Sequence, residues 1–312
     1  MVTGCAGFIG SHLSEALVAQ GHEVVGIDCF TDYYPRAAKE ANLAALLDSP
    51  HFTFIEADLL EYDLGRLLEG TDCVYHQAAQ AGVRASWGQN FAIYTQNNVL
   101  ATQRLLEAAK DRPLRRFVYA SSSSIYGDAR QLPVTEETLP QPVSPYGVSK
   151  LAAEHLCRLY RVNFGVPTVS LRYFTVYGPR QRPDMGFHRF LRALLTDGEI
   201  TLYGDGEQTR DFTFVSDAVA ANLACLDAEV SGEVFNIGGG SRVSINRVLA
   251  ILEAISGKKP RVRRIGKQKG DVRDTFADTS RAREALGFRP SVSIEEGLRR
   301  ELEWLAGVVD HE

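Results

Sequence analysis

Paired cysteines are missing from this sequence. Its five cysteines are scattered along 312 residues, at Cys5, Cys29, Cys73, Cys157 and Cys225. They form no C-x-x-C pair and have no spacing to histidine that would suit a metal site. This scatter predicts no metal site. We expect free thiols in the reducing environment of the cytoplasm.

Long apolar runs and long basic runs are missing as well. No apolar stretch reaches the roughly 20 residues of a membrane span, and the amino terminus lacks the charged and apolar regions of a signal peptide. The formal net charge is -5, and no ladder of aromatic residues stands among basic ones. We therefore expect a soluble cytoplasmic protein that binds neither nucleic acid nor membranes.

What the sequence does contain is a regular alternation of elements. From Val2 to about Val169, short β-branched runs alternate with helical patterns, which predicts a parallel sheet covered by helices on both faces. This is the α/β class with a doubly wound, Rossmann-type sheet. The strands expected after the first are 23–27, 52–55, 73–76, 116–120 and 167–171.

The alternation stops after Leu171. Loops rich in glycine and proline follow, with a short strand expected at 200–203 and a helix at 245–256. We expect a Rossmann domain at 1–175, to which 211–240 returns, and a smaller substrate-binding domain at 176–210 and 241–312. Only Met1 and Val2 precede the first glycine loop, whereas a strand usually needs about 5 residues. We therefore expect the chain to lack a few residues at its start.

Glycines three residues apart follow the first strand, at Gly4, Gly7 and Gly10. Backbone without side chains can approach a pyrophosphate at a helix amino terminus, although a tight turn also favours glycine and G-x-G-x-x-G is the commoner spacing. Asp28 ends the second strand, where a carboxylate can accept both ribose hydroxyls and would repel a 2'-phosphate. This favours NAD over NADP. Asp58 ends the third strand and suits either the adenine amino group or a helix cap.

Tyr146 and Lys150 open a helix expected to run to about Phe164. Their i to i+4 spacing puts a phenol and an ammonium on one face, although such a pair also occurs by chance on helix surfaces. A nearby lysine and a positive nicotinamide ring would both lower the phenol pKa from its usual value near 10, so that the phenolate could take a proton from a hydroxyl. Upstream, Ser121–Ser124 stand at a strand end. Their hydroxyls either hold a substrate oxygen or form an ordinary serine-rich turn.

Taken together with 76–79 and 97–99, these motifs resemble the extended short-chain dehydrogenase/reductase family over nearly the whole chain. In its second half the chain resembles the nucleotide-sugar members, at 171–174, 203–206, 210–212 and 236–240. The resemblance implies a catalytic trio of Ser122, Tyr146 and Lys150. It also implies an NAD site made by Gly4, Gly7, Phe8, Ile9, Gly10, Asp28, Asp58, Leu59, Gln77, Ala78, Ala79, Asn98, Tyr146, Lys150 and Tyr173.

The same resemblance implies a UDP-sugar substrate. Tyr203 and Phe212 would line the uracil pocket, and Arg210 would meet the diphosphate together with Gln208 and Arg273. Members of the family oxidise C4 of the sugar and differ in what the 4-keto intermediate undergoes next. Dehydratases carry Asp-Glu where this chain has Ser123–Ser124, and UDP-glucuronate decarboxylases carry Glu in place of Ser124. Serines cannot replace those carboxyls as acid or base, so epimerisation is the expected outcome.

A proline-flanked arginine segment, 174–184, refines the expected substrate. An arginine fork matches a carboxylate or a phosphate with paired hydrogen bonds. Together with 82–88, this segment resembles UDP-glucuronate 4-epimerases, which implies that Arg182 binds the C6 carboxylate. Arg182 has two alternative roles to carboxylate binding: it could bind the diphosphate, or it could form a salt bridge behind the site. Hydroxyl donors would be Thr175 and Ser86, and the predicted substrate set also includes Arg84, Ser122 and Ser123.

The expected activity is therefore interconversion of UDP-glucuronate and UDP-galacturonate with bound NAD. We expect a homodimer, because helices at 98–109 and 150–162 resemble those that pair across a two-fold axis in relatives. Three alternatives remain: a 4-epimerase of neutral UDP-glucose or UDP-N-acetylglucosamine, a UDP-glucuronate decarboxylase, and a non-catalytic NAD-binding scaffold.

Overall fold

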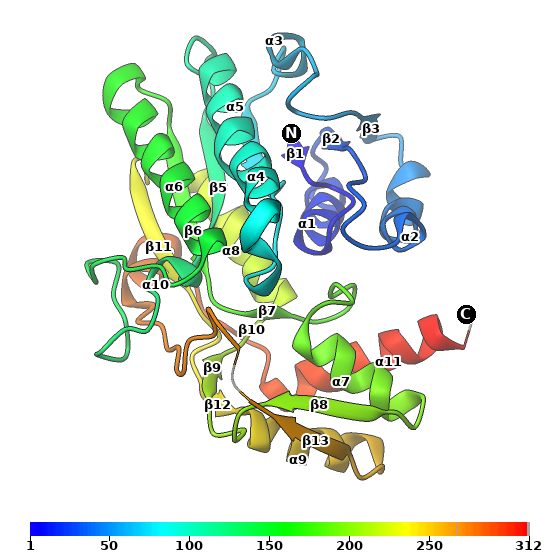
Figure 1. Ribbon diagram of the computed structural model, residues 1–312. Helices are drawn as coiled ribbons and strands as arrows, with labels where there is room; N and C mark the ends of the chain where they lie inside the picture. The colour runs from blue at the N-terminus through cyan, green and yellow to red at the C-terminus, as the bar shows by residue number, and fades with distance from the viewer. Residues whose placement is uncertain (267, 311–312) are drawn as a thin grey trace.

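A computed structural model describes residues 1–266 and 268–310. At its centre is a seven-stranded parallel sheet in the order β3-β2-β1-β4-β5-β6-β11 (Figure 1). The strand order reverses between β1 and β4, and ligands of open α/β sheets bind at the carboxyl ends of the strands beside such a reversal. The predicted doubly wound sheet is confirmed. Its strands are β1 (Val2–Thr3), β2 (Val24–Asp28), β3 (Phe52–Glu56), β4 (Cys73–His76), β5 (Arg116–Ser122), β6 (Thr168–Tyr173) and β11 (Glu233–Ile237).

The strands predicted from the sequence coincide with β2 to β6 to within two residues. Parallel strands covered on both faces read as continuous apolar runs, and β5 and β6 are buried along their whole length. The first strand is as short as the sequence indicated. β1 has two residues, yet it pairs with both β2 and β4. Four of the five cysteines are buried, and Cys29 is exposed.

Helices cover both faces of the sheet (Figure 1). One face carries α1 (Phe8–Ala19), α2 (Arg36–Leu47) and α8 (Val215–Asp227), and the other carries α3 (Leu64–Leu67), α5 (Ala101–Ala109) and α6 (Pro145–Phe164). The boundaries of α6 follow from its sequence: Ser144 caps the first turn, Pro145 opens it, and Gly165 ends the helix at a φ of 76°. Within 1–266 and 268–310, no helix combines the length and apolar character needed to cross a bilayer.

The helix leading into α5 is irregular. Two short 3₁₀ turns, Arg84–Ser86 and Gly88–Asn90, precede α4 (Phe91–Tyr94), and a π-helical segment, Thr95–Leu100, joins α4 to α5. Such π segments are rare and occur frequently at functional sites. This one contains Asn97 and Asn98.

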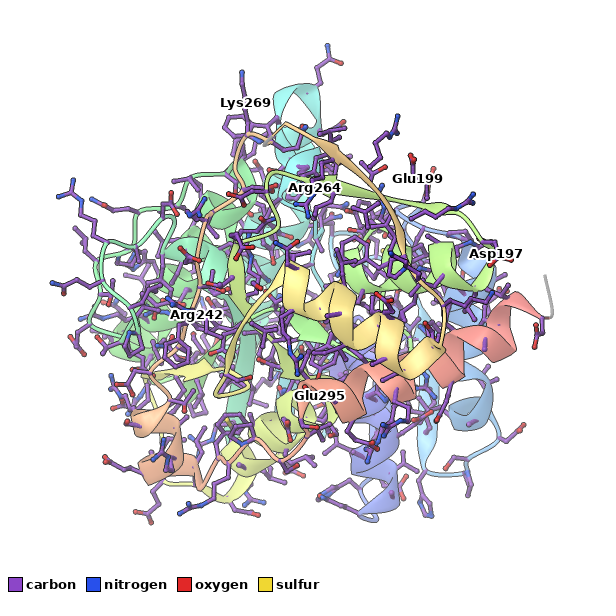
Figure 2. All side chains as sticks on the ribbon, turned by 90° about the horizontal axis from the view of Figure 1, so that it is seen from below. Asp197, Glu199, Arg242, Arg264, Lys269 and Glu295 are labelled. Atoms are coloured by element: carbon purple, nitrogen blue, oxygen red, sulfur yellow. The ribbon has the colours of Figure 1, made fainter. Side chains whose placement is uncertain are left out.

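A second lobe lies below the sheet in Figure 1. It contains α7 (Gly186–Leu195), α9 (Ile245–Ser256), α11 (Ile294–Val309) and the parallel pair β8 (Glu199–Tyr203) and β13 (Arg261–Ile265). Seen from below, charged side chains including Asp197 and Glu199 surround this pair (Figure 2). Asp197 forms an ion pair with Lys258 at 2.9 Å, and Glu199 forms one with Arg263 at 2.9 Å.

The remaining elements are short. They are the 3₁₀ turn Ser123–Ile125, β7 (Val176–Tyr177), β9 (Thr209–Asp211), β10 (Thr213–Phe214), β12 (Arg242–Ser244) and α10 (Ser280–Leu286). The apolar core is continuous between the parts, since Leu171 of the sheet and Phe212 and Leu298 of the lower region belong to one cluster of buried side chains.

Candidate active site

Two adjoining cavities open at the carboxyl ends of the strands. The first, of about 220 Å³, is lined by the glycine loop, by Asp28 and by Lys150, and we call it the sheet-end cavity. The second, of about 840 Å³, extends into the second lobe, and we call it the interlobe cavity. Tyr146, Arg182 and Tyr33 are among the residues that line both. A group held in one cavity would therefore meet a group held in the other at Tyr146.

The glycine loop packs too tightly to hold side chains. A Cβ on Gly10 would lie 2.1 Å from the carbonyl oxygen of Gly4, and a Cβ on Gly4 would lie 2.8 Å from the backbone of Ala78. Gly4 also has a φ of 67°, which favours glycine. Gly7 precedes α1 and provides no side-chain cap, so the first N–H groups of the helix stay available to an anion. All three glycines line the sheet-end cavity, as do Phe8 and Ile9.

Asp28 also lines this cavity, at the end of β2. Its carboxylate accepts hydrogen bonds from the backbone N–H groups of Ala6 (3.2 Å) and Phe30 (2.9 Å). Burial raises the pKa of the Asp28 carboxyl, while these bonds and the charge of Lys39 act in the opposite direction. Lys39 holds the following loop by donating to the carbonyl of Thr31. Cys29, Tyr33, Tyr34 and Lys39 line the same cavity, and no sequence motif indicated them.

Asp58 fits both interpretations that the sequence left open. Its carboxylate accepts the backbone N–H of Leu60 at 2.8 Å, a local turn that is common for aspartate. Asp58 and Leu59 nevertheless both line the sheet-end cavity, where the adenine end of a dinucleotide would lie. The local turn leaves room for a ligand contact at the other carboxylate oxygen.

His76 holds the residue that precedes the glycine loop, Thr3, through a hydrogen bond. The hydroxyl of Thr102 donates to the carbonyl of Asn98 (2.7 Å), so it must accept from Nε2 of His76 (2.9 Å). Nδ1 then accepts from the hydroxyl of Thr3 at 2.8 Å. Burial lowers the pKa of His76 to about 3, and the ring stays neutral. Thr3 in turn accepts the N–H of Ala78 at 3.1 Å, which positions Gln77, Ala78 and Ala79 along the cavity.

Asn98 lies behind the cavity rather than in its lining. Its side chain accepts the N–H of Gln80 (2.7 Å), donates to the carbonyl of Gln80 (3.0 Å) and donates to the hydroxyl of Ser149 (2.9 Å). Ser149 then donates to the carbonyl of Tyr146 at 2.8 Å. Asn98 therefore holds the first turn of α6, while its neighbour Asn97 lines the cavity.

Tyr146 and Lys150 occupy successive turns of α6, and Ser122 ends β5. Burial raises the pKa of the Tyr146 phenol, and hydrogen bonding to Ser122 and the charge of Arg182 lower it. Burial lowers the pKa of Lys150 to about 8, and its ammonium lies 4.9 Å from the ring centre of Tyr119. The sequence suggested that Lys150 and a bound nicotinamide ring would both lower the phenol pKa. In this chain alone the lowering influences are Ser122 and Arg182.

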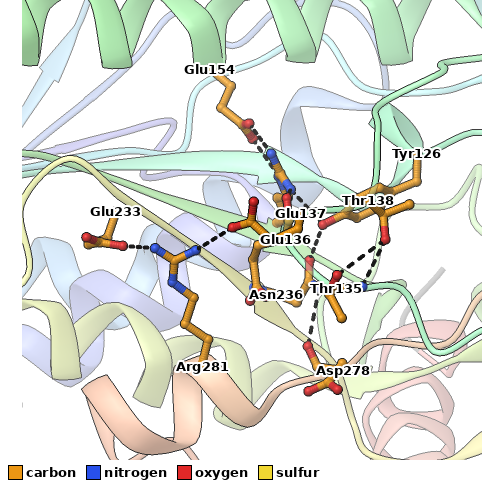
Figure 3. A network of polar contacts seen from close by, with 11 residues as sticks. Tyr126, Thr135, Glu136, Glu137, Thr138, Glu154, Glu233, Asn236, Asp278 and Arg281 are labelled. Atoms are coloured by element: carbon orange, nitrogen blue, oxygen red, sulfur yellow. Dashed lines mark hydrogen bonds and ion pairs between the residues drawn. The ribbon is translucent and has the colours of Figure 1, made fainter.

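A buried ion pair supports the serine run from behind. Glu154 forms a fork with Arg172 at 2.6 and 3.1 Å, and the Ser121 hydroxyl donates to the same carboxylate at 2.5 Å. The phenol of Tyr126 accepts from Arg172 and donates to Asn236, both at 2.7 Å (Figure 3). This network connects α6, β6 and β11 to the strand end that carries Ser122.

Tyr173 closes the sheet-end cavity on the side of β6. Its phenol oxygen accepts from the amides of Asn222 (2.7 Å) and Gln77 (3.3 Å), and Gln77 also donates to Asn222 at 3.0 Å. Asn222 comes from α8 and is fully buried. Two cavity-lining side chains, Tyr173 and Gln77, therefore depend on one buried amide that the sequence did not indicate.

Ten of the predicted substrate residues line the interlobe cavity. They are Arg84, Ser122, Ser123, Thr175, Arg182, Tyr203, Gln208, Arg210, Phe212 and Arg273. Ser86 does not line it, because its side chain is buried and donates to the carbonyl of Val83 at 2.7 Å. Asp184, which ends the segment 174–184, also lines this cavity. Further lining residues that no sequence motif indicated include Met185, Phe187, Arg189 and Asp271.

The far end of the interlobe cavity combines aromatic and cationic groups. Arg84 lies 4.0 Å from the ring centre of Tyr203 and forms a fork with Asp271 at 3.1 and 2.6 Å. Arg210 donates to the carbonyls of Val272 and Arg273 at 2.7 and 2.9 Å, and burial lowers its pKa. A flat ring together with cations suits a base joined to phosphates.

The two arginines of the segment 174–184 have separate roles. Arg180 turns toward α1, where it donates to the carboxylate of Glu15 at 2.7 Å and to the hydroxyl of Ser11 at 3.3 Å. Arg182 forms a fork with Asp184 at 3.0 and 3.2 Å and lines both cavities. Only Arg182 can therefore meet a ligand beside Tyr146.

Comparisons with known proteins agree with this geometry. A family model described as the NAD dependent epimerase/dehydratase family matches residues 1–238. An uncharacterized UDP-glucose epimerase of Bacillus subtilis (strain 168) is 46% identical over 314 residues, covering 100% of this chain and 99% of that protein. A UDP-glucuronate 4-epimerase of Thermodesulfobacterium geofontis is 40% identical over 310 residues, covering 97% and 95%.

Among solved structures, UDP-glucuronic acid 4-epimerase from Bacillus cereus in complex with UDP-glucuronic acid and NAD matches with a TM-score of 0.96. It is 46% identical, and the match covers 98% of each chain. The agreement extends over the sheet and the second lobe together. This chain belongs to the NAD dependent epimerase/dehydratase family.

Proposed function

We propose that this protein is a UDP-glucuronate 4-epimerase that interconverts UDP-glucuronate and UDP-galacturonate. The observation that carries the proposal is the position of Arg182, whose guanidinium lies at the junction of the two cavities, beside Tyr146. A uronate differs from a neutral sugar in its C6 carboxylate, and an arginine fork is the side chain best suited to a carboxylate. The relatives from Thermodesulfobacterium geofontis and Bacillus cereus carry this activity in their names.

The sheet-end cavity fits NAD. Its glycine loop admits a pyrophosphate at the start of α1, and Asp28 stands where the adenosine ribose would lie. Bound NAD supplies the hydride acceptor and donor of the reaction. Tyr173 and Gln77 shape the nicotinamide end of the cavity, and Lys150 binds the adjacent ribose.

Tyr146 is the proposed base. It removes the proton of the C4 hydroxyl while Ser122 orients that oxygen, and it returns the proton after the keto sugar has presented its other face. Ser122 and Arg182 already lower the phenol pKa in this chain, and the ammonium of Lys150 adds a further positive charge on the same helix face.

The same site restrains loss of carbon dioxide. Oxidation at C4 makes a β-keto acid, which loses its carboxylate easily when that group is desolvated and out of the ring plane. We assign Arg182 and Thr175 to hold the carboxylate in a polar environment. Ser123 and Ser124 offer no carboxyl to act as general acid or base for elimination.

The uridine diphosphate would occupy the far end of the interlobe cavity. We assign Tyr203 and Phe212 to the uracil, with Arg84 packed over the ring of Tyr203. We assign the diphosphate to two cations and one amide near the second lobe, Arg210, Arg273 and Gln208.

The functional unit would be a homodimer. The outer face of α6 carries Val148, Leu159 and Val162, which are 46%, 51% and 74% exposed. With Ala152 and His155 between them they recur at spacings of four and three residues, the pattern of a helix-pairing seam. Phe91, Ile93 and Leu100 are exposed on the neighbouring irregular helix. A cytoplasmic location and the domain division at 175 and 211–240 stay predictions.

A 4-epimerase of neutral UDP-sugars is the second candidate. The observation that favours it is the fork between Arg182 and Asp184, which gives the two side chains together no net charge. The relative from Bacillus subtilis is named a UDP-glucose epimerase.

Proton NMR of UDP-glucuronate incubated with enzyme and NAD tests the proposal. We expect the anomeric signals of UDP-galacturonate to appear with the C5 proton retained. A pentose product would indicate a decarboxylase, and unchanged UDP-glucuronate with turnover of UDP-glucose would indicate the neutral-sugar enzyme. Arg182→Ala should weaken binding of UDP-glucuronate and leave binding of UDP-glucose nearly unchanged.

A further inference from the structure

The loop that carries Arg182, residues 178–185, is fixed from both lobes. The N–H of Gly178 donates to the buried carboxylate of Glu301 on α11 at 2.8 Å. Arg180 is bound to Glu15 on α1. The side chain of Gln181 is buried, and its amide oxygen accepts the N–H of His188 at 3.0 Å. The backbone on either side of Arg182 is therefore held, and the direction of its guanidinium depends on what its side chain contacts.

Asp184 contacts one edge of that guanidinium. Its two oxygens accept from Nε at 3.0 Å and from Nη2 at 3.2 Å. A guanidinium has a second edge, formed by Nη1 and the other hydrogen of Nη2, which can donate to a second carboxylate in the same plane. Within 1–266 and 268–310, no group accepts a hydrogen bond from Nη1, and Arg182 lines both cavities. The free edge is thus available beside the sugar site.

Tyr33 in turn fixes Asp184. Its phenol donates to the oxygen of Asp184 that accepts from Nη2, at 3.1 Å, and its ring centre lies 5.8 Å from the guanidinium carbon. Burial raises the pKa of the Tyr33 phenol, so it remains a donor at neutral pH. Tyr33 belongs to the loop after Asp28. That loop is anchored by the bond from the Phe30 N–H to Asp28 and by Lys39.

We propose that Asp184, oriented by Tyr33, is a positioning residue that directs the free edge of Arg182 at the C6 carboxylate of the substrate. This inference rests on the proposed function. Asp184 acts through Arg182, and Tyr33 links that position to the loop beside the adenosine end of the NAD site. Selectivity for a uronate then depends on two residues beyond the one that touches the carboxylate.

The test compares binding of UDP-glucuronate and UDP-glucose to the NAD-loaded enzyme by calorimetry. Asp184→Asn keeps the size of the side chain and breaks the fork, so we expect about a tenfold rise in Kd for UDP-glucuronate. Tyr33→Phe should raise it by about threefold. Both variants should bind UDP-glucose within about twofold of the parent, because that sugar has no carboxylate to misalign. A general loss of folding would weaken both ligands together.

Asp32→Ala is the matched control, since Asp32 is an exposed carboxylate beside Tyr33 and does not line either cavity. Unchanged or tighter binding of UDP-glucuronate by Asp184→Asn would overturn the inference, because the charge of Asp184 would then matter more than its hold on Arg182. Arg182→Ala distinguishes failure of the proposed function from failure of the role of Asp184 and Tyr33. If it does not reduce selectivity, the proposed function fails; if it alone does, only the role of Asp184 and Tyr33 fails.

Discussion

Burial moves the pKa values of the two titrating side chains on α6 apart. It raises that of Tyr146 and lowers that of Lys150, so both side chains are shifted toward their neutral forms. An uncharged pair cannot help to form a phenolate. Activity therefore requires Lys150 to remain protonated, which a pKa of about 8 allows at neutral pH, and it requires the opposing influences of Ser122 and Arg182 on Tyr146.

Lys150→Met should stabilise the protein while it impairs turnover. The pKa of Lys150 falls from 10.5 to about 8 on folding, which at about 1.4 kcal/mol per pH unit amounts to roughly 3 kcal/mol of unfavourable burial of the charge. Between pH 8 and pH 10.5 the unfolded chain binds more protons at Lys150 than the folded chain does, so the stability of the parent rises with pH. We expect the advantage of Lys150→Met to be largest below pH 8 and absent above pH 10.5.

Urea denaturation at pH 7 and at pH 10.5, with the cofactor removed from all proteins, measures this difference. Lys259→Met is the matched control, because Lys259 is exposed on the second lobe and should show little change at either pH. Equal stability of the parent and Lys150→Met at pH 7 would mean that the ammonium is adequately solvated in the cavity.

Tyr146→Phe removes the proposed base without removing a binding contact to the uridine. We expect a loss of turnover of about 10²-fold to 10⁴-fold, with UDP binding retained because the far end of the interlobe cavity is untouched. Tyr160→Phe, on the same helix, removes a phenol that donates to Glu107 far from the cavities and should stay active. Near-normal turnover of Tyr146→Phe would exclude Tyr146 as the base.

Among the elements, the π-helical segment has the clearest structural task. It places Asn98 where one side chain serves the N–H and carbonyl of Gln80 and the hydroxyl of Ser149. Asn98→Ala would leave these buried groups without partners, at about 1 to 3 kcal/mol for each unsatisfied group. We expect a fall of about 3 kcal/mol in the free energy of unfolding, measured by denaturant titration.

Gln96→Ala is the comparison variant for Asn98→Ala. Gln96 lies in the same segment but is exposed, so its replacement should change stability by less than about 0.5 kcal/mol. Similar effects of the two substitutions would mean that the segment is stabilised by helix packing rather than by the hydrogen bonds of Asn98.

The main elements were predictable from the sequence for a physical reason. Strands buried on both faces need continuous apolar runs, and glycine, proline and serine mark the ends of α6, so β2 to β6 and α6 stood out. The π-helical segment gave no such signal: its threonine, two asparagines and valine are weak helix formers, and nothing in them specifies a π turn. Its geometry depends on tertiary contacts that the local sequence does not contain.

The candidate site was predictable where a short motif carries the chemistry. The glycines, Asp28, Tyr146 and Lys150 fall in such motifs and line the sheet-end cavity. Tyr33 and Asn222 are distant in the sequence from the groups they contact, so no spacing could reveal them. Asp184 lies two residues from Arg182 in the segment 174–184, but the sequence does not show that the two side chains form a fork. Ser86 illustrates the reverse case, since a matching motif placed a hydroxyl in the set although its side chain is buried against Val83.

For the whole molecule, the exposed apolar seam on α6 predicts association. Leu159→Glu would put a charge into the centre of the proposed helix-pairing face, and we expect a monomer by light scattering where the parent is a dimer. Leu139→Glu is the matched control, because Leu139 is 72% exposed in a loop outside the seam. A monomeric parent protein would refute the proposed homodimer.

One cysteine is exposed and four are buried, so the reactivity of the thiols can report local opening of the folded protein. Cys29 lines the sheet-end cavity beside Asp28, whereas Cys5, Cys73, Cys157 and Cys225 lie within the cores on the two faces of the sheet. We expect brief alkylation followed by mass spectrometry to find a single modified thiol, slowed by added NAD. The other four thiols should react only during unfolding of the sheet, so their rates would measure its free energy of opening in the native state.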